Sequence, residues 1–240
     1  MIKEALKYIV DLASPDVQVI RGEVYSDKPL HRINYIPYAN KIDMQTLSSL
    51  LDYIKSGVDT FRGKMILHVK SPTLVSLYST LDDERNRECV VNVTASVPEF
   101  PFGRFVDHET FCIGVQSKFV DDPSTDKALL LKFAGTVEAG SVSEYGDDGI
   151  SQKATVKTGI ASKGAAIIPS PATLKPYRTF LEVEQPASSF IFRMKDGGSN
   201  GVQCALYEAD GGAWQLAAME SIKGYLRNEL EGYDNLTIIS

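Results

Sequence analysis

The chain has 240 residues, of which 43% are hydrophobic, so it can bury a sizeable core as one large domain or two small ones. Its 25 Lys and Arg residues against 31 Asp and Glu residues give a formal charge of -6, which weighs against a protein that wraps duplex DNA through a broad basic face. Cys89, Cys112 and Cys204 are odd in number and far apart, so the sequence encodes neither a disulfide framework nor a paired-cysteine zinc site, and reduced thiols in a cytoplasm are expected.

The first fifteen residues predict a helix and not a signal peptide. Glu4, Lys7 and Asp11 interrupt the segment, and no apolar core region follows it. Its apolar residues recur at helical spacing until Ser14 and Pro15 end the pattern. The longest apolar or small stretches, around 128–137 and 164–169, are shorter than the roughly 20 residues that span a bilayer. We therefore expect no membrane-spanning segment.

The next hundred residues alternate between strand and helix periods. A hairpin is predicted from strands at 17–24 and 33–35 around the turn residues 27–29. Thr46 is placed to cap a helix over 47–56 that stops at Gly57, and a strand follows over 65–69. A further helical piece is predicted over 74–81, then a turn and a valine-rich strand over 89–97.

A pair of helices is predicted near the middle of the chain. Asp107 can cap the first, in which Phe111, Val115 and Phe119 lie one turn apart. Residues 121–124 break the pattern, and Ser124 is predicted to cap a second helix that ends near Gly140. Two consecutive helices with a short connection predict an antiparallel pair.

The last hundred residues indicate mostly sheet. Strands are predicted near 150–160, 179–184, 189–194 and 201–208, and apolar residues at every fourth position from Trp214 to Leu230 predict a closing helix, with a last strand over 214–219 as the alternative. Without regular βαβ units, the pattern predicts an α+β fold with mainly antiparallel sheet, an N-terminal helix, a central helical pair and a C-terminal helix. We expect two regions, 1–97 and 98–240, with a soft boundary at 98–105, unless they form one continuous domain.

Four blocks of the sequence carry a family resemblance. They are DDGISQ at 147–152, PSPATLKPYRTF at 169–180, PYRTFLEVEQPASSFIFR at 176–193 and LYEADGGAW at 206–214. In this order they resemble a YfdQ-like family of phage and prophage proteins, over most of the chain and most strongly from about Glu109 to Glu229. The resemblance implies a role in the cytoplasm of a bacterial host, as an accessory protein. The family has no function that can be carried over residue by residue, and we expect no catalytic residues and no cofactor.

An aromatic loop near residue 100 is the main candidate for binding. Its phenylalanines alternate with proline and glycine beside one arginine, so the loop can stack bases or anchor a partner. Base stacking would contribute about 1 to 3 kcal/mol per aromatic side chain, next to a groove built from few cations, Lys118 and Lys175 among them. Packing inside the protein or across a subunit contact is the alternative. The candidate binding residues are Phe100, Phe102, Arg104, Phe105, Arg178 and Arg193.

Carboxylates in predicted turns are the only candidates for a metal site. Asp147, Asp148, Glu208 and Asp210 lie within the blocks that carry the resemblance, and a hard divalent ion needs several such oxygens at one point. Solvated turns explain the same residues, because Asp initiates turns by bonding to its own backbone. If the chain holds a metal, we expect it there.

Three catalytic patterns are incomplete. Ser124 and Lys127 match S-x-x-K, and residues 157–159 match K-T-G, but the S-D-N element of penicillin-binding serine acyltransferases is missing between them. His108-Glu109 lacks the second histidine of a zinc hydrolase. The glycine-rich run 196–201 lacks the lysine of a phosphate-binding loop and is typical of a hairpin tip.

These observations predict a non-catalytic binding module. We expect a homo-oligomer in which strand edges and aromatic loops meet between copies, with single-stranded nucleic acid, a nucleotide or a host protein as the target and no membrane as a partner. A metal-dependent hydrolase that uses the clustered carboxylates is the first alternative. A structural component of the virion is the second.

Overall fold

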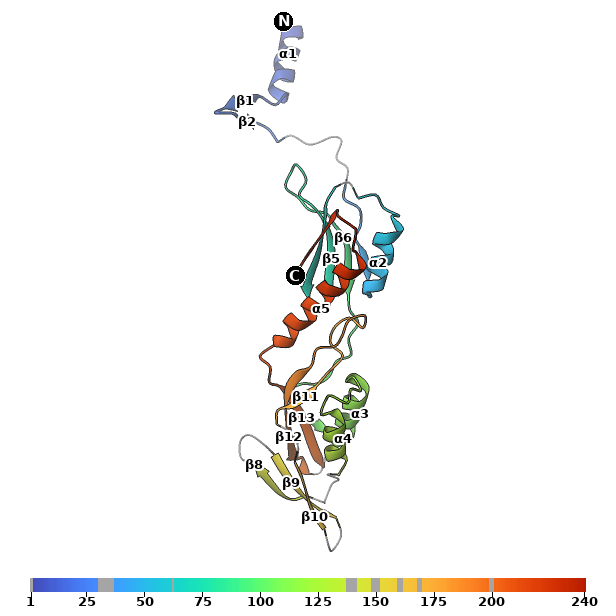
Figure 1. Cartoon of the computed structure of the whole chain (residues 1–240). Coiled ribbons are helices and arrows are strands. Elements are labelled where there is room, and N and C mark those ends of the chain that lie inside the picture. Colours follow the sequence, from blue (N-terminus) through green and yellow to red (C-terminus); the bar gives the residue numbers. More distant parts are fainter. Residues whose placement is uncertain are drawn as a thin grey trace. The chain divides into compact units, whose positions relative to one another are not determined.

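The computed structural model of the chain describes residues 2–29, 37–61, 63–136, 142–147, 152–158, 162–167, 170–198 and 201–240. The chain divides into two compact units, Met1–Ala39 and Asn40–Ser240. This division differs from the regions 1–97 and 98–240 expected from the sequence. Figure 1 colours the chain by residue number, so the first unit is drawn in blue. No described helix combines the length and the apolar composition needed to cross a membrane.

The N-terminal unit consists of one helix and one hairpin. Helix α1 (Ile2–Ala13) is followed by β1 (Val17–Ile20) and β2 (Glu23–Ser26), which pair antiparallel. Arg21 and Gly22, with φ of 55° and 86°, form the two-residue turn, in the left-handed backbone that suits the twist of a tight hairpin. The hairpin is therefore closed by β2, and the predicted second strand at 33–35 lies outside the described residues.

The larger unit begins with a five-stranded mixed sheet. Its order is β14 (Leu236–Ile239), β4 (Met65–Ser71), β5 (Leu74–Ser79), β6 (Cys89–Thr94) and β3 (Ile42–Met44). The three central strands β4, β5 and β6 pair antiparallel. Each outer strand pairs parallel to its neighbour, β14 to β4 and β3 to β6. Helices α2 (Leu47–Ser56) and α5 (Ala213–Glu229) bury their apolar faces against the same side of this sheet (Figure 1). This packing forms the first core.

Helix α2 begins and ends where the sequence predicts. The hydroxyl of Thr46 accepts a hydrogen bond from the backbone N–H of Ser49 at 3.1 Å, which satisfies one free donor of the first turn. Gly57 follows the helix with φ of 60°, a conformation that glycine adopts at little cost.

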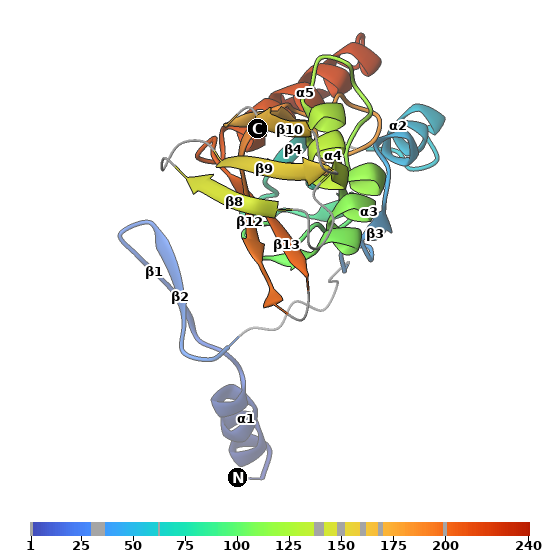
Figure 2. The ribbon, with the colours of Figure 1, turned by 90° about the horizontal axis from the view of Figure 1, so that it is seen from below.

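A second core forms around a four-stranded antiparallel sheet. Its order is β11 (Ala172–Leu174), β12 (Ser188–Asp196), β13 (Val202–Glu208) and β7 (Val106–Asp107). Helices α3 (His108–Lys118) and α4 (Lys127–Thr136) pack together on one face of it, as Figures 1 and 2 show. Asp107 caps α3 by accepting from Thr110 N–H at 2.8 Å, and this bond lowers the pKa of Asp107.

A third sheet is built from β8 (Val142–Asp147), β9 (Gln152–Thr158) and β10 (Ser162–Ile167). The strands pair antiparallel in the order β10-β9-β8. With the helical pair α3 and α4, the N-terminal helix α1 and the C-terminal helix α5, the described residues confirm an α+β fold with mainly antiparallel sheet.

Three local predictions are wrong. Residues 74–79 form strand β5 and not a helix, because their apolar residues fit both periods and pairing with β4 and β6 on either side decides the outcome. Residues 179–184 form no strand. Ser124 does not cap α4, since its hydroxyl donates to Asp122. The predicted closing helix is confirmed as α5, so the alternative strand over 214–219 does not form, and a further strand that was not predicted, β14, follows the helix.

The segment 176–187 forms a bridge between the two cores. Phe180 and Val183 pack into the first core, whereas the strands on either side of the segment belong to the second. The hydroxyl of Thr179 donates to the carbonyl of Pro72 at 2.5 Å. Glu182 accepts at 3.1 Å from the N–H of Ser48, in the first turn of α2. We call residues 176–187 the bridge segment.

The buried amide of Gln185 organises the bridge segment. Its oxygen accepts from the N–H groups of Arg178 and Thr179 at 3.0 and 3.2 Å, and its nitrogen donates to the carbonyls of Phe180 and Val183. Because Gln185 is 5% exposed, water cannot replace these bonds without opening the segment.

The Gln185→Ala variant should lose about 2 to 4 kcal/mol of unfolding free energy, because buried donors and acceptors of the bridge segment are left unpaired. Urea titration followed by circular dichroism measures the loss. The matched control is Leu181→Ala, at a side chain in the same segment that is 73% exposed and should change stability by less than ~0.5 kcal/mol. Equal effects of the two changes would contradict the role given to Gln185.

Candidate functional site

The aromatic loop at 98–105 packs two of its rings into the second core. Phe100 meets Phe119 edge-on with ring centroids 5.0 Å apart, and Phe102 stacks on Phe190 at 5.4 Å. A Cβ atom on Gly114 would lie 3.0 Å from the Phe100 ring, so the glycine makes room for that ring against α3. These contacts occupy ring surface that base stacking would need, and they fix the loop on the protein.

The same loop forms one wall of a hollow of about 550 Å³. Phe100, Phe102 and Arg104, three of the residues predicted to bind, line it together with Glu99 and Lys118. Arg104 is exposed, and the Lys118 ammonium donates to the carbonyl of Glu99 at the rim. The hollow is therefore lined by two cations and two partly buried aromatic rings. We call it the loop hollow.

Backbone contacts hold both cations of the loop hollow in place. Gly103, with φ of 71°, donates its N–H to the carbonyl of Leu206 at 2.8 Å, which ties the loop beside Arg104 to β13. Lys118 ends α3, and its carbonyl accepts from Tyr177 N–H at 2.9 Å. The strand β13 and the bridge segment thus position the two sides of the hollow.

Arg178 lies elsewhere, buried between the second sheet and the start of α5. Its guanidinium donates to Glu208 at 2.6 Å and to the hydroxyl of Ser188, and it lies 4.0 Å above the ring of Trp214. Burial lowers the pKa of Arg178 to about 10, against the opposing effect of Glu208 and Asp210. Its Nε atom is buried without a hydrogen-bond partner. This arginine attaches α5 to the sheet.

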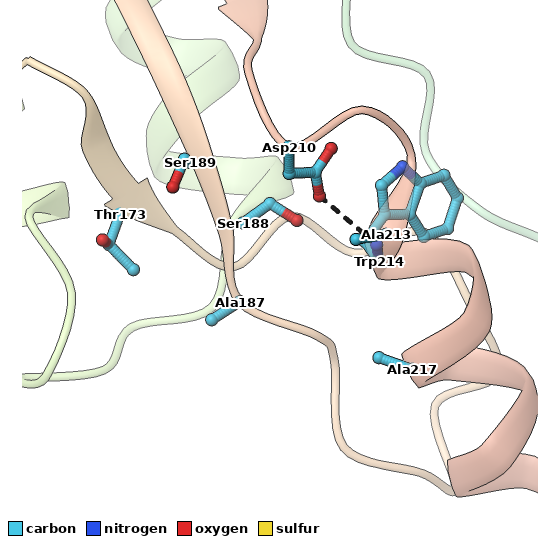
Figure 3. A pocket seen from close by; sticks show the side chains of 8 residues that line it. All are labelled: Thr173, Ala187, Ser188, Ser189, Asp210, Ala213, Trp214 and Ala217. Carbon is cyan, nitrogen blue, oxygen red and sulfur yellow. Dashed lines mark hydrogen bonds between the residues drawn. The ribbon is translucent and has the colours of Figure 1, made fainter.

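A small recess of about 250 Å³ lies beside this attachment (Figure 3). Ser188, Ser189 and Asp210 contribute its polar lining, and Trp214 stands at one side (Figure 3). Asp210 accepts from the N–H groups of Gly212 and Trp214 at 3.0 and 3.3 Å, so its carboxylate is engaged at the first turn of α5. These bonds give Asp210 a structural role.

Arg193 and Phe105 lie on the face of the second sheet opposite α3 and α4. Arg193 donates to the carbonyl of its own neighbour Phe192 at 2.9 Å. The Lys195 ammonium lies 4.3 Å above the ring of Phe105, which meets Tyr207 edge-on at 6.4 Å. The six residues predicted to bind are therefore distributed over three places, and the loop hollow brings three of them together.

The four carboxylates proposed for a metal do not form a described cluster. Glu208 and Asp210 are bound to Arg178 and to the first turn of α5. Asp148 and the side chain of Asp147 lie outside the described residues. Within the part of the chain that the structure describes, no three His, Cys, Asp or Glu side chains converge as metal ligands.

Two pairs of side chains that could act as nucleophile and base are bonded to other groups. Lys127 is buried and donates to the carbonyl of Phe119 at 2.8 Å and to that of Gln116, while Ser124 donates to Asp122. The sulfur of Cys112 lies 3.5 Å from Nε2 of His108, but that nitrogen is 2.7 Å from the carbonyl of Ala134. A carbonyl only accepts, so Nε2 carries a proton and cannot take one from Cys112.

Burial also works against thiol chemistry near this histidine. It raises the pKa of Cys112, and it raises the pKa of Cys204 to about 12, with Cys112 and Asp107 adding to the shift. The thiolate is the nucleophilic form, so both thiols are poor nucleophiles at neutral pH.

A further recess, of about 250 Å³, lies on the five-stranded sheet, on the face opposite α2 and α5. Ile66, His68, Tyr78 and Ile239 reach it from β4, β5 and β14, and Arg87 reaches it from the loop before β6. The sequence pattern does not mark these residues as a site. Alternation of polar and apolar residues in 65–71 was the available signal, but it does not show which strands are neighbours.

No family model, characterised protein or solved structure matches the chain. The resemblance to YfdQ-like phage proteins thus stays a prediction.

Replacing the buried guanidinium should separate its structural role from surface charge. Arg178→Met should lower the unfolding free energy by about 2 kcal/mol and shift the fluorescence of Trp214, the one tryptophan of the chain, because the stacked cation and its bonds are lost. Arg193→Met is the matched control, since that guanidinium bonds only to its own strand among the hydrogen bonds described. An unchanged emission spectrum for Arg178→Met would contradict the stacking.

Proposed function

We propose that this protein is a phage-encoded accessory protein that acts without catalysis, as a homo-oligomeric binding module. Its ligand is an anion with a planar part, a nucleotide or a short single-stranded nucleic acid, and the loop hollow is the binding site. The proposal places the protein in the cytoplasm of the bacterial host. The loop hollow, with its two cations beside aromatic rings, is the observation that carries the proposal.

The geometry of the loop hollow supports an anionic ligand. Arg104 and Lys118 supply two positive charges to the lining, and Glu99 is the one carboxylate among the lining residues. An arginine can hold a phosphate through two parallel N–H donors, while a lysine acts as a point charge. The rings of Phe100 and Phe102, which line the hollow, offer apolar contact for a base or sugar.

The size of the hollow fits a small ligand or a single strand. Its volume of about 550 Å³ falls within the range of about 300 to 1,000 Å³ that is usual for small-molecule sites. A duplex would need a broad positive surface, and the formal charge of -6 does not favour one. A single nucleotide or a few bases of a single strand need only the local pair of cations.

The groups that catalysis would use support a binding role. The described pairs Ser124 with Lys127 and Cys112 with His108 are engaged in bonds that keep them from acting as nucleophile and base. Glu208 accepts a hydrogen bond from Arg178, and Asp210 accepts one from the backbone at the start of α5. Because these groups are engaged in bonds that stabilise the fold, we expect the loop hollow to act by binding its ligand through shape and charge.

Affinity for a fluorescent oligothymidylate and for a fluorescent nucleotide tests the proposal by anisotropy. Arg104→Ala should weaken binding by about tenfold, equal to ~1.4 kcal/mol, because one charge-assisted phosphate contact is lost. The slope of log K against log salt should fall by ~0.7 for the single strand.

Arg87→Ala is the matched control, because Arg87 lines the recess on the five-stranded sheet and not the loop hollow. It should leave the affinity unchanged. Loss of binding in Arg87→Ala with full binding in Arg104→Ala would move the site to that recess. No measurable binding of either probe to the unaltered protein would reject a nucleic acid or nucleotide as the ligand.

A further inference from the structure

The N-terminal unit exposes more apolar side chain than its own residues can cover. On α1, the large apolar side chains of Ile2, Leu6, Tyr8, Ile9, Val10 and Leu12 are 57–81% exposed. The hairpin adds Val17, Val19 and Val24 on one of its faces, at 50–69%. No residue described between 2 and 29 is buried. An isolated two-stranded hairpin and a twelve-residue helix are each marginally stable in water.

The apolar face of α1 is too wide for a surface helix that packs on one neighbour. At 3.6 residues per turn, its apolar side chains cover an arc of about 200°. A two-stranded coiled coil needs only a narrow seam, whereas an arc of this width suits a bundle in which each helix contacts two others. The face therefore indicates contacts with more than one helix.

The polar side of α1 is divided by charge. Lys3 and Lys7 follow one flank of the apolar arc, and Glu4 and Asp11 follow the other. Helices that lie parallel in a ring turn opposite flanks toward each other, so lysines meet carboxylates. Antiparallel neighbours would instead turn identical flanks together and repel.

The charge of this side also argues against a lipid surface. Helices that lie on membranes carry an excess of Lys and Arg on the polar face. Here two lysines are balanced by two carboxylates. A chain with the same pattern in the same direction is the partner whose charges complement it.

We propose that α1 assembles several copies of the chain through a parallel helical bundle, with the β1–β2 hairpins gathered beside it. This inference rests on the homo-oligomeric part of the proposed function and names the contact that makes the oligomer. The partner is a second copy of this chain, and each copy contributes the same apolar arc and both charged flanks.

Native mass measured by light scattering at about 10 μM tests the bundle in the full chain. The unaltered protein should have a mass of at least three times 26.4 kDa, and the Leu6→Glu/Ile9→Glu variant should fall to 26.4 kDa. Val58→Glu is the matched control, at an apolar side chain of the larger unit that is 71% exposed, and it should keep the mass of the unaltered protein.

The outcomes distinguish contacts made by α1 from other contacts. A monomeric unaltered protein would overturn both the bundle and the homo-oligomer. An oligomer that persists in Leu6→Glu/Ile9→Glu would overturn the bundle alone and leave the oligomer to another surface. If the double variant is a monomer and its thermal midpoint is lower than that of the unaltered protein, α1 packs on its own chain. That result would also overturn the bundle.

Charge exchange tests the pairing of the flanks without touching the apolar arc. Lys3→Glu/Lys7→Glu and Glu4→Lys/Asp11→Lys should each reduce assembly, and a one-to-one mixture should restore it. The Ile2→Cys variant tests direction, because a parallel bundle brings this position together in neighbouring copies. Oxidation should then give a disulfide-linked dimer that the unaltered chain does not form. Failure to form it would overturn the parallel arrangement.

Discussion

The buried amide of Gln185 is the constraint on which the larger unit depends. The two sheets do not share a strand, so the relation between their cores is set by segments that pass from one to the other. The bridge segment has no regular secondary structure, so its backbone N–H and C=O groups need hydrogen-bond partners outside a helix or a β-sheet. Gln185 supplies four of them from one side chain. Phe180 can then enter the first core while the adjoining strands remain in the second.

The loop hollow depends on this arrangement. Residues 175–177 run beside the end of α3, where Lys175 O accepts from Val120 N–H at 2.8 Å and Tyr177 N–H donates to Lys118. Lys175 also pairs with Asp122 at 2.7 Å and with Glu184 at 2.9 Å, and the bond from Lys175 holds the pKa of Asp122 well below its usual range. The end of α3, which carries one cation of the hollow, is thus tied to both ends of the bridge segment.

Local signals in the sequence were sufficient for the elements whose ends are chemically marked. Thr46 and Gly57 delimit α2, and Asp107 begins α3, because capping depends on residues within one turn. Long-range pairing decided the rest. Residues 74–79 became a strand between two others, and 236–239 became one by pairing with β4 across more than 160 residues of sequence. In both segments the pairing that decides the outcome comes from strands that the local sequence does not identify as neighbours.

The candidate site was predictable in composition and less so in geometry. The aromatic and cationic character of residues 98–105 is visible in the sequence, and three of the residues chosen there line one hollow. That Phe100 would be fixed against Gly114, or that Arg178 would be buried under Trp214, depends on how two sheets and three helices pack. Sequence spacing does not report such packing, so Arg178 and Arg193 looked equivalent to Arg104.

The proposed assembly and the proposed binding would be connected through effective concentration. A site with two cations and two aromatic rings offers few contacts, and each copy alone is expected to bind a single strand weakly. Copies joined by α1 would present several such sites to one strand, and the second contact would then be intramolecular, at millimolar effective concentration for short connections. A binding site of low affinity and an exposed amphipathic helix in one chain are consistent with these two roles: the helix would supply several linked sites, and the loop hollow would recognise the ligand.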